Sequence, residues 1–344
     1  MALLAACATP PVPQVDVSAD KLPDIAYLKV QDLRAEYRQA FCQRLPANAR
    51  CDDVLLHFPG ERGQVWSSEV ATSPVQQKEA IAALTKRFRI ALAPGFLTGC
   101  TGSVSMPLTD TLDALLAQGF DAKLLKIEGR GSTEQNGDLI AQQLSEAPND
   151  PRTWIVLGYS KGLPDTLDAL VRHPVLSRNV AAILSYAGAL GGSLVADDLG
   201  SWKEKLVEAL PMPGCAAGDG ASIRELHRDV RRAWWDANRS RVHVPIFSLV
   251  GTPRPERVSP GLRKYYEQIA PVSAFNDGQL LATDAIVPGS RFLGYVNADH
   301  WGIAIPMSSQ APLLSKMYID DVPRGDLVIA ALLVIGNHTP SRND

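Results

Sequence analysis

The sequence predicts an α/β fold in which helices flank a mostly parallel central sheet. From Arg89 onward, short apolar runs alternate with stretches of helix-forming residues, the order expected of a parallel sheet covered on both faces. Hydrophobic residues make up 46% and charged residues 21% of the 344 residues, ordinary values for a globular protein with a sizeable core. The runs that we expect to be strands are residues 89–93, 122–126, 153–157, 181–187, 244–250 and 292–296.

The chain divides into one α/β domain with additions. Residues 89–187 and 244–338 carry the alternating pattern and form the predicted domain. Residues 188–243 interrupt it with a segment rich in helix formers, which predicts a helical lid insertion. Residues 23–88 precede the domain and are expected to pack on it as an N-terminal extension. Residues 1–22 read as a leader remnant and tether.

Three shorter segments carry their own predictions. Residues 24–45 form a charged, helix-compatible stretch that ends before Pro46, and residues 54–58 are a brief strand-like run. The apolar residues 327–335 are too few to cross a membrane and predict a buried core helix.

The first residues resemble the lipobox of bacterial lipoproteins, because Leu4, Ala5 and Ala6 precede Cys7. The resemblance implies membrane attachment through a lipid on Cys7 and a bacterial protein that is secreted or held in the cell envelope, in the periplasm or on the outer membrane. The basic and apolar regions that precede such a box are missing. A truncated or misassigned start and a chance match therefore stay as alternatives.

The four cysteines other than Cys7 are an even number, which suits disulfide bonds in an oxidising compartment. Cys42 and Cys51 flank a short loop and are candidates for one bond, and Cys100 and Cys215 for another. Buried free thiols are the alternative.

Charge and motif spacing argue against several functions. Thirty-four basic and 37 acidic side chains give a net charge of −3 without a long run of one sign, so we expect no nucleic-acid partner. His-Glu-x-x-His, Cys-x-x-Cys, Walker and Gly-x-Gly-x-x-Gly patterns do not occur in the sequence. We therefore expect no metal and no cofactor.

A serine lies in the setting of a nucleophile elbow. The predicted strand at 153–157 runs into Gly158-Tyr159-Ser160-Lys161-Gly162, and a helical run follows. Such an elbow needs glycines on both sides, since a Cβ there would collide with the neighbouring strand and helix. The motif occurs once in the chain, between strand and helix as the elbow requires. We predict that Ser160 is a nucleophile; an incidental serine in a glycine-rich turn is the alternative.

Histidine is the natural base for a serine nucleophile. Partners in this arrangement follow in the order serine, acid, histidine, which removes His57 and favours a late histidine. His300 directly follows the last predicted strand, whereas His338 is six residues from the end and reads as a solvated tail residue. His300 is the predicted base, and a histidine that caps its loop is the alternative.

Two carboxylates compete for the acid. Asp277, in Asn-Asp-Gly, lies 23 residues before His300 and resembles the acid loop of bacterial triacylglycerol lipases. Asp284, in Asp-x-x-Val-Pro, resembles the acid loop of many other esterases. We favour Asp277 and keep Asp284 as the alternative. The side chain of Asp299, next to the base, is expected to point the other way.

The tetrahedral oxyanion of acyl transfer needs main-chain donors. One is the amide after the nucleophile, on Lys161, and the other is expected from the loop after an early strand. That loop, Pro94-Gly95-Phe96-Leu97, resembles the His-Gly-x-x loop of lipases with proline in place of histidine, so Phe96 would supply the second amide. A plain β-turn is the alternative.

These motifs cover residues 89–305 and together resemble the α/β-hydrolase superfamily, most closely its bacterial lipases and carboxylesterases. The resemblance implies a serine carboxylesterase or lipase that hydrolyses hydrophobic esters through a Ser-His-Asp triad and an acyl-enzyme. Small-molecule, lipid and polymer esters, aliphatic polyesters among them, are the substrates to consider. An acyltransferase, a thioesterase and a non-catalytic binding member of the fold are the alternatives, and the oligomeric state stays open.

We expect the substrate to meet apolar side chains near the serine and on the insertion. On the insertion, Trp202, Leu206, Trp234 and Trp235 either line an acyl site or pack a lid helix onto the domain. The predicted substrate-binding residues are Leu97, Tyr159, Trp202, Trp234 and Trp301.

Overall fold

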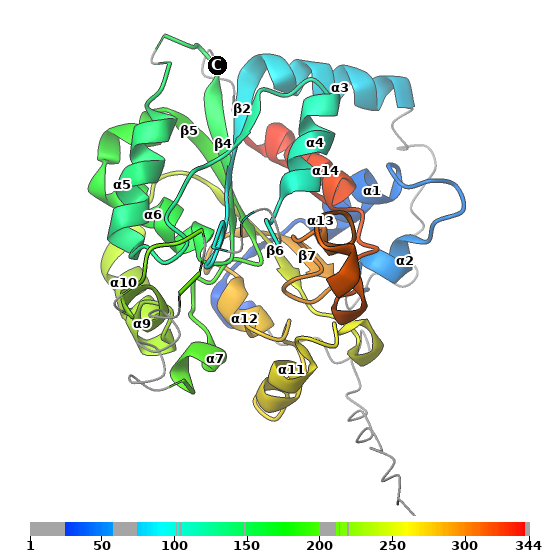
Figure 1. Ribbon diagram of the computed structural model, residues 1–344. Helices are drawn as coiled ribbons and strands as arrows, with labels where there is room; N and C mark the ends of the chain where they lie inside the picture. The colour runs from blue at the N-terminus through cyan, green and yellow to red at the C-terminus, as the bar shows by residue number, and fades with distance from the viewer. Residues whose placement is uncertain are drawn as a thin grey trace, which may run out of the picture.

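The centre of the molecule is a parallel sheet (Figure 1). Its seven strands lie in the order β1-β7-β6-β5-β4-β2-β3. The computed structural model describes residues 25–57, 74–100, 102, 105–147, 149–199, 211–212, 214–218 and 220–340. The strands are β1 (Gln31–Asp32), β2 (Phe88–Ala93), β3 (Ala122–Leu124), β4 (Thr153–Tyr159), β5 (Val180–Tyr186), β6 (Ile246–Gly251) and β7 (Arg291–Val296).

The predicted α/β class is confirmed, and each of the six predicted strands overlaps an observed one. Their central positions are almost completely buried because helices cover both faces of the sheet, which explains the continuous apolar runs. The strand β1 was not predicted. It has two exposed residues and pairs with β7 at one edge, so its sequence carries no apolar signal.

Two helical layers enclose the sheet (Figure 1). On one side, α5 and α6 pack on each other, and on the other side α1, α3 and α4 pack around α14. The helices are α1 (Arg34–Cys42), α2 (Cys51–Val54), α3 (Pro74–Arg87), α4 (Thr109–Ala117), α5 (Thr133–Leu144), α6 (Gly162–Arg172), α7 (Leu194–Asp197), α9 (Ala221–Arg224), α10 (Arg228–Asn238), α11 (Arg263–Ile269), α12 (Ala282–Ala285), α13 (Met307–Gln310) and α14 (Arg324–His338). Short 3-10 turns connect them at Ala26–Leu28, Pro174–Arg178, Arg239–Arg241, Pro255–Arg257 and Pro312–Met317.

The helix α14 fills the core on one side of the sheet. Its residues from Leu327 to Ile335 are buried apart from the half-buried Leu333, as the sequence predicts for this run. No helix in the described part of the chain is both long and apolar enough to span a bilayer. His338 ends the helix, and its Nε2 lies 2.7 Å from a carboxylate oxygen of Glu36 on α1.

The described part of the N-terminal extension lies against α14 and β7. Tyr37 and Phe41 on α1 are fully buried, and the Tyr37 hydroxyl donates to the carbonyl of Leu327 at 3.1 Å. In the described part of the predicted strand-like run at 54–58, residues 54–57, there is a single bridge, between Leu55 and Val296, and Val54 closes α2 instead. The predicted leader and tether, with Cys7, lie outside the described residues.

Two disulfide bonds join segments that the sheet does not connect. Cys42 is bonded to Cys51, which ties α1 to α2. Cys100 is bonded to Cys215 across 115 residues, which ties the loop after β2 to the insertion between β5 and β6. The helices α7, α9 and α10 of that insertion are described, whereas Trp202 and Leu206 lie outside the described residues.

Shortening a buried side chain of α14 tests how far the fold depends on this helix. Ile335 is fully buried, so Ile335→Ala leaves a cavity and should lower the free energy of unfolding in urea by about 2–5 kcal/mol. Val175→Ala removes methyl groups from a side chain that is 72% exposed and should change it by less than about 0.5 kcal/mol. Equal losses from the two variants would contradict the role of α14 in the core.

Candidate active site

Ser160 lies on a tight bend between β4 and α6. Its φ angle is 53°, in the left-handed region that costs a residue with a side chain roughly 1–3 kcal/mol. A Cβ on Gly162 would come within 2.2 Å of the carbonyl oxygen of Ala93, and one on Gly158 within 2.7 Å of the Leu163 Cα. The two glycines therefore let the strand and the helix approach closely enough to hold the strained serine.

The side chains of Ser160, His300 and Asp277 form one line of hydrogen bonds. The imidazole Nε2 lies 2.9 Å from the serine Oγ, and Nδ1 lies 2.7 Å from Asp277 Oδ2. A carboxylate can accept a hydrogen bond but cannot donate one, so Nδ1 carries the proton. Nε2 is left to accept from the serine hydroxyl. The exposed fractions are 9% for the serine, 2% for the histidine and 1% for the aspartate, so little water reaches this line.

The second oxygen of Asp277 is also engaged. Its Oδ1 accepts the main-chain N–H groups of Gln279 and Leu280 at 2.9 and 2.7 Å, and the main-chain N–H of His300 donates to the Asp277 carbonyl at 2.8 Å. The loop after β6 and the loop after β7 are thereby joined. The carboxylate is held in a single orientation toward the imidazole.

Asp284, the alternative acid, lies elsewhere. It is on α12, and its carboxylate accepts from Arg228 Nε at 2.7 Å and from Arg232 Nη2 at 3.0 Å. Both arginines belong to α10, so this buried aspartate ties α12 to the insertion. Of the two competing acids, the structure brings Asp277 to His300 and keeps Asp284 away from it.

Asp299 faces away from the imidazole, as expected. Its carboxylate accepts the main-chain N–H of Gly302 at 2.7 Å and that of Ser259. Burial raises the pKa of this carboxyl, and these N–H donors oppose the rise in pKa. Asp299 thus fastens the loop that carries His300 to the segment before α11.

The predicted oxyanion donors lie on both sides of the serine. A Cβ built on Gly95 would approach Ser160 Cβ to 2.8 Å and Oγ to 3.3 Å, so the loop after β2 passes directly over the nucleophile. The hydrogen bonds among the described residues use the N–H of Leu97, but not those of Phe96 and Lys161. These two amides remain available to an oxygen bound at the serine.

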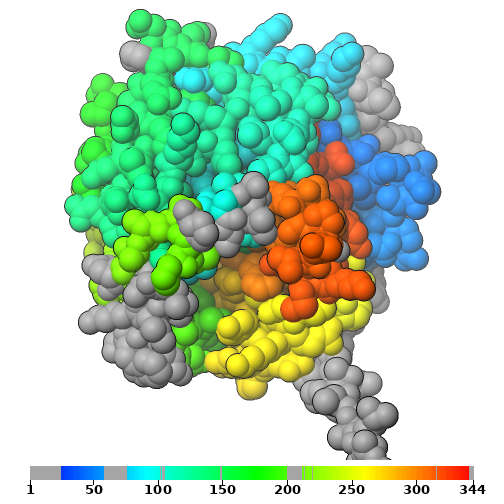
Figure 2. Space-filling model, in the orientation of Figure 1, coloured from blue at the N-terminus to red at the C-terminus, as the bar shows by residue number. Residues whose placement is uncertain are grey.

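A pocket of about 210 Å³ opens at the serine, and its wall is mainly apolar. Leu97, Tyr159 and Trp301 line it, as expected of substrate-binding residues. The wall includes residues that follow His300 in the chain. Their segment lies beside the segment that leads into α11 (Figure 2), and the two are joined where the N–H of Gly261 donates to the Met317 carbonyl at 3.2 Å. The complete lining is Phe96, Leu97, Thr98, Ser105, Pro107, Tyr159, Ser160, Gln279, His300, Trp301, Ile305 and Tyr318.

The pocket contains residues that sequence reasoning missed. Tyr318 is 5.0 Å from Trp301 between ring centroids, but it follows a 3-10 turn and belongs to no motif, so no signal marks it. Gln279 and Ile305 each lie within five residues of a predicted triad member, and that proximity was the available signal.

Tyr159 contacts His300 through both its ring and its hydroxyl. Its ring lies 5.2 Å from the imidazole between centroids, and its hydroxyl donates to the main-chain carbonyl of His300 at 2.6 Å. Burial, and after it the charges of Asp277 and Asp299, raise the pKa of the Tyr159 hydroxyl well above its usual value. The hydroxyl therefore stays protonated and keeps donating this bond.

The expectation that Trp234 lines the substrate site is wrong. Trp234 is not part of the pocket wall, and it packs with Trp235 against the core cluster on the α5 and α6 side of the sheet. The guanidinium of Arg231, one turn earlier on α10, lies 4.8 Å from the Trp234 ring. The amphipathic helix α10 uses these rings to cover the domain, which is the alternative that the sequence left open. Trp202 lies outside the described residues.

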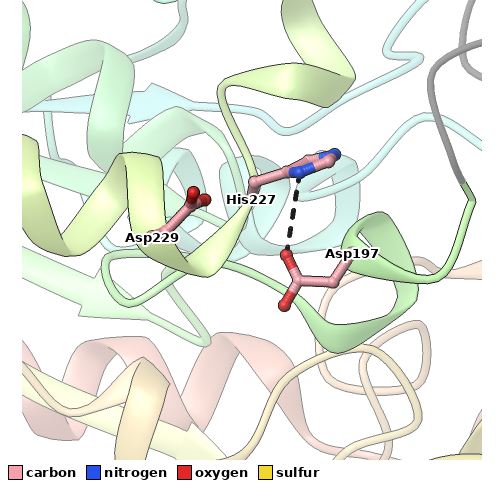
Figure 3. Close-up of side chains that lie close together, drawn as sticks. All are labelled: Asp197, His227 and Asp229. Carbon is pink, nitrogen blue, oxygen red and sulfur yellow. Dashed lines mark ion pairs between the residues drawn. The ribbon is translucent and has the colours of Figure 1, made fainter.

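One group of side chains in the described part of the chain is close enough to share a metal ion: Asp197, His227 and Asp229 (Figure 3). They come from α7 and the start of α10, far apart in the sequence, so motif spacing does not reveal them. Asp197 Oδ1 lies 3.9 Å from His227 Nδ1 and already accepts the main-chain N–H of Arg228 at 3.0 Å. None of the three lines the pocket at Ser160.

Comparison with known proteins places this geometry in context. No family model and no curated protein sequence matches the chain. Among solved structures, a metagenomic carboxyl esterase, MGS0156, is similar over 95% of this chain and 96% of its own, with a TM-score of 0.80 and 28% sequence identity. The mature lipase BlEst2 of Bacillus licheniformis shares the fold over 67% of this chain and 92% of its own, with a TM-score of 0.51 and 20% identity. The chain therefore has the α/β-hydrolase fold and is similar over nearly its whole length to a carboxyl esterase, and in fold to a lipase.

Proposed function

We propose that the chain hydrolyses carboxylic esters through a covalent acyl-enzyme on Ser160, with His300 as general base and Asp277 as the acid of the triad. The observation that carries the proposal is the buried line from Asp277 Oδ2 to His300 at 2.7 Å and from His300 to Ser160 Oγ at 2.9 Å, at the wall of an apolar pocket. The similarity to a carboxyl esterase over nearly the whole chain supports it.

The geometry suits a two-step reaction. Ser160 Oγ bonds to the ester carbonyl carbon while its proton moves to His300 Nε2, and the amides of Phe96 and Lys161 donate to the oxyanion. The tetrahedral intermediate then breaks the bond to the alcohol, which leaves with the proton from Nε2. Water then attacks the carbonyl carbon of the acyl-serine while His300 Nε2 takes its proton. The carboxylic acid is released, and the proton on Nε2 returns to the serine Oγ. Asp277 stabilises the imidazolium in both steps.

The pocket argues for an apolar acyl group. Phe96, Leu97, Trp301, Ile305 and Tyr318 are among the residues that line it, so an alkyl chain gains free energy by leaving water there. Its volume of about 210 Å³ is modest, so we propose that short acyl chains fit wholly within it. Short-chain glycerides and the exposed ends of aliphatic polyesters meet this condition.

The two disulfide bonds, Cys42–Cys51 and Cys100–Cys215, support an oxidising location for the mature protein. Together with the resemblance around Cys7, they lead us to propose a secreted or cell-envelope enzyme with a lipid anchor.

Removing the nucleophile tests the proposal. Ser160→Ala should lower kcat for p-nitrophenyl butyrate by at least about 10⁴-fold, because no alkoxide can form. Ser248→Ala is the matched control, since Ser248 is also a buried serine at the sheet, but its Oγ bonds to Ser290 Oγ and to the N–H of Val287 rather than to an imidazole. It should keep the parent rate. A Ser160→Ala protein that turns over the ester at the parent rate would refute the assignment.

The same substitution, aspartate to asparagine, distinguishes the roles of Asp277 and Asp284. Asp277→Asn should lower kcat by about 10⁴-fold, because the amide favours the wrong tautomer of His300. Asp284→Asn should leave kcat within about threefold and lower the melting temperature instead, since Asp284 pairs with Arg228 and Arg232. The opposite pattern, with the Asp284 variant inactive and the Asp277 variant active, would exchange their roles.

Acyl-chain preference tests the pocket. Across p-nitrophenyl esters from acetate to palmitate, kcat/KM should peak at butyrate to hexanoate and fall for longer chains, which extend beyond the wall. Trp301→Ala should move the maximum toward longer chains, because it removes the largest side chain from the wall. A parent protein that prefers palmitate would contradict a short acyl site.

A further inference from the structure

The side chain after the nucleophile is a buried lysine. Lys161 is 1% exposed, and its ammonium lies 2.7 Å from Oδ1 of Asp165, one turn along α6 and fully buried. The same residue offers its main-chain N–H to the oxyanion in the proposed mechanism. The ion pair therefore holds in place the residue whose main-chain N–H is a proposed oxyanion donor.

The ion pair continues into α5. Asp165 Oδ2 accepts from Asn136 Nδ2 at 2.9 Å, and Asn136 is 1% exposed. Asn136 also bonds both main-chain groups of Glu128: Oδ1 accepts the Glu128 N–H at 3.0 Å, and Nδ2 donates to the Glu128 carbonyl at 3.1 Å. A single asparagine thus fixes the loop between β3 and α5 to the base of the nucleophile helix.

That loop holds the other oxyanion donor. The carbonyl of Gly129, next to Glu128, accepts the N–H of Leu97 at 2.8 Å, and Leu97 follows Phe96. Leu97 has a φ angle of 62°, so this bond holds a strained residue in place. A Cβ on Gly129 would come within 2.4 Å of the Thr98 carbonyl oxygen and 2.7 Å of the Cys100 sulfur, so the two loops are in close contact.

We propose that Asp165 and Asn136 are positioning residues that set the spacing between the two oxyanion donors, Lys161 and Phe96. This inference rests on the proposed function. A continuous path of polar contacts runs from Lys161 through Asp165, Asn136 and Glu128–Gly129 to Leu97. Donors stabilise the oxyanion well only when they are held at the right place before the reaction begins, and a misplacement of about 1 Å costs on the order of 100-fold in rate.

Burial makes a positioning role a better explanation than a stabilising one. A buried ion pair seldom contributes more to stability than apolar side chains of the same size, because both charges lose their water. It does impose one geometry, since an unpaired charge at this depth is strongly unfavourable. Neither Asp165 nor Asn136 lines the pocket, so neither contacts the substrate directly.

Asn136→Ala tests the proposal by removing the link between the two sides. For p-nitrophenyl butyrate, kcat should fall about 10- to 100-fold while KM stays within about twofold, because donor placement matters most in the transition state. Phenylboronic acid, which forms a tetrahedral adduct with a nucleophilic serine, should bind more weakly by a similar factor. Butyrate, a planar product, should inhibit equally in both proteins. Tyr37→Phe, which removes one buried hydrogen bond on the far side of the sheet, should keep all four values.

A second variant covers the case in which Asn136→Ala does not fold. Asp165→Asn keeps the shape of the side chain but removes its charge and replaces one acceptor oxygen by an NH2 group, so Lys161 and Asn136 can no longer both donate to it. It should give the same pattern in kcat and in phenylboronic acid affinity. Folded variants with parent kcat and parent boronate affinity, or with a raised KM at constant kcat, would overturn the positioning role. A Ser160→Ala protein as active as the parent would instead remove the proposed function itself.

Discussion

The strained main chain of Ser160 is the constraint on which the rest of the site depends. At a φ angle of 53°, the serine stays on its bend only because β4, α6 and the end of β2 pack too closely to let it relax. Gly158 and Gly162 permit that packing. The same contacts turn the hydroxyl toward the imidazole and bring the loop after β2 over it. Strain, close packing and catalytic geometry are thus one arrangement, which is common where a backbone outlier sits at a functional site.

The parallel sheet brings the other groups to this bend. Ser160 follows β4, Asp277 lies in the excursion after β6, and His300 follows β7, so all three reach the site from the carboxyl ends of parallel strands in one sheet. The loop after β7 is then fastened in two ways: the His300 N–H donates to the Asp277 carbonyl, and the Asp299 carboxylate accepts the N–H groups of Gly302 within the loop and of Ser259 before α11. The histidine therefore needs little reorganisation when the serine proton arrives.

Sequence reasoning succeeded where the signal was local and failed where contacts over long sequence distances decide the structure. Buried strands and the elbow at Ser160 have short patterns that packing alone explains, and His300 follows from chain order. In contrast, β1 exists because β7 offers an edge, and Trp234 faces the core because of how α10 lies on α5 and α6. The arginine partners of Asp284 are more than fifty residues before it in the chain, so no pattern around Asp284 shows that it is already paired.

Covalent labelling of the folded protein tests the central claim most directly. A fluorophosphonate probe reacts with a serine only when a neighbouring base activates it. Intact mass and peptide mapping should reveal one adduct, on Ser160. No adduct should form when the probe is added to protein unfolded in urea, or to a His300→Ala protein that keeps its fold. An adduct on another residue, or labelling of Ser160 that does not depend on His300, would contradict the account.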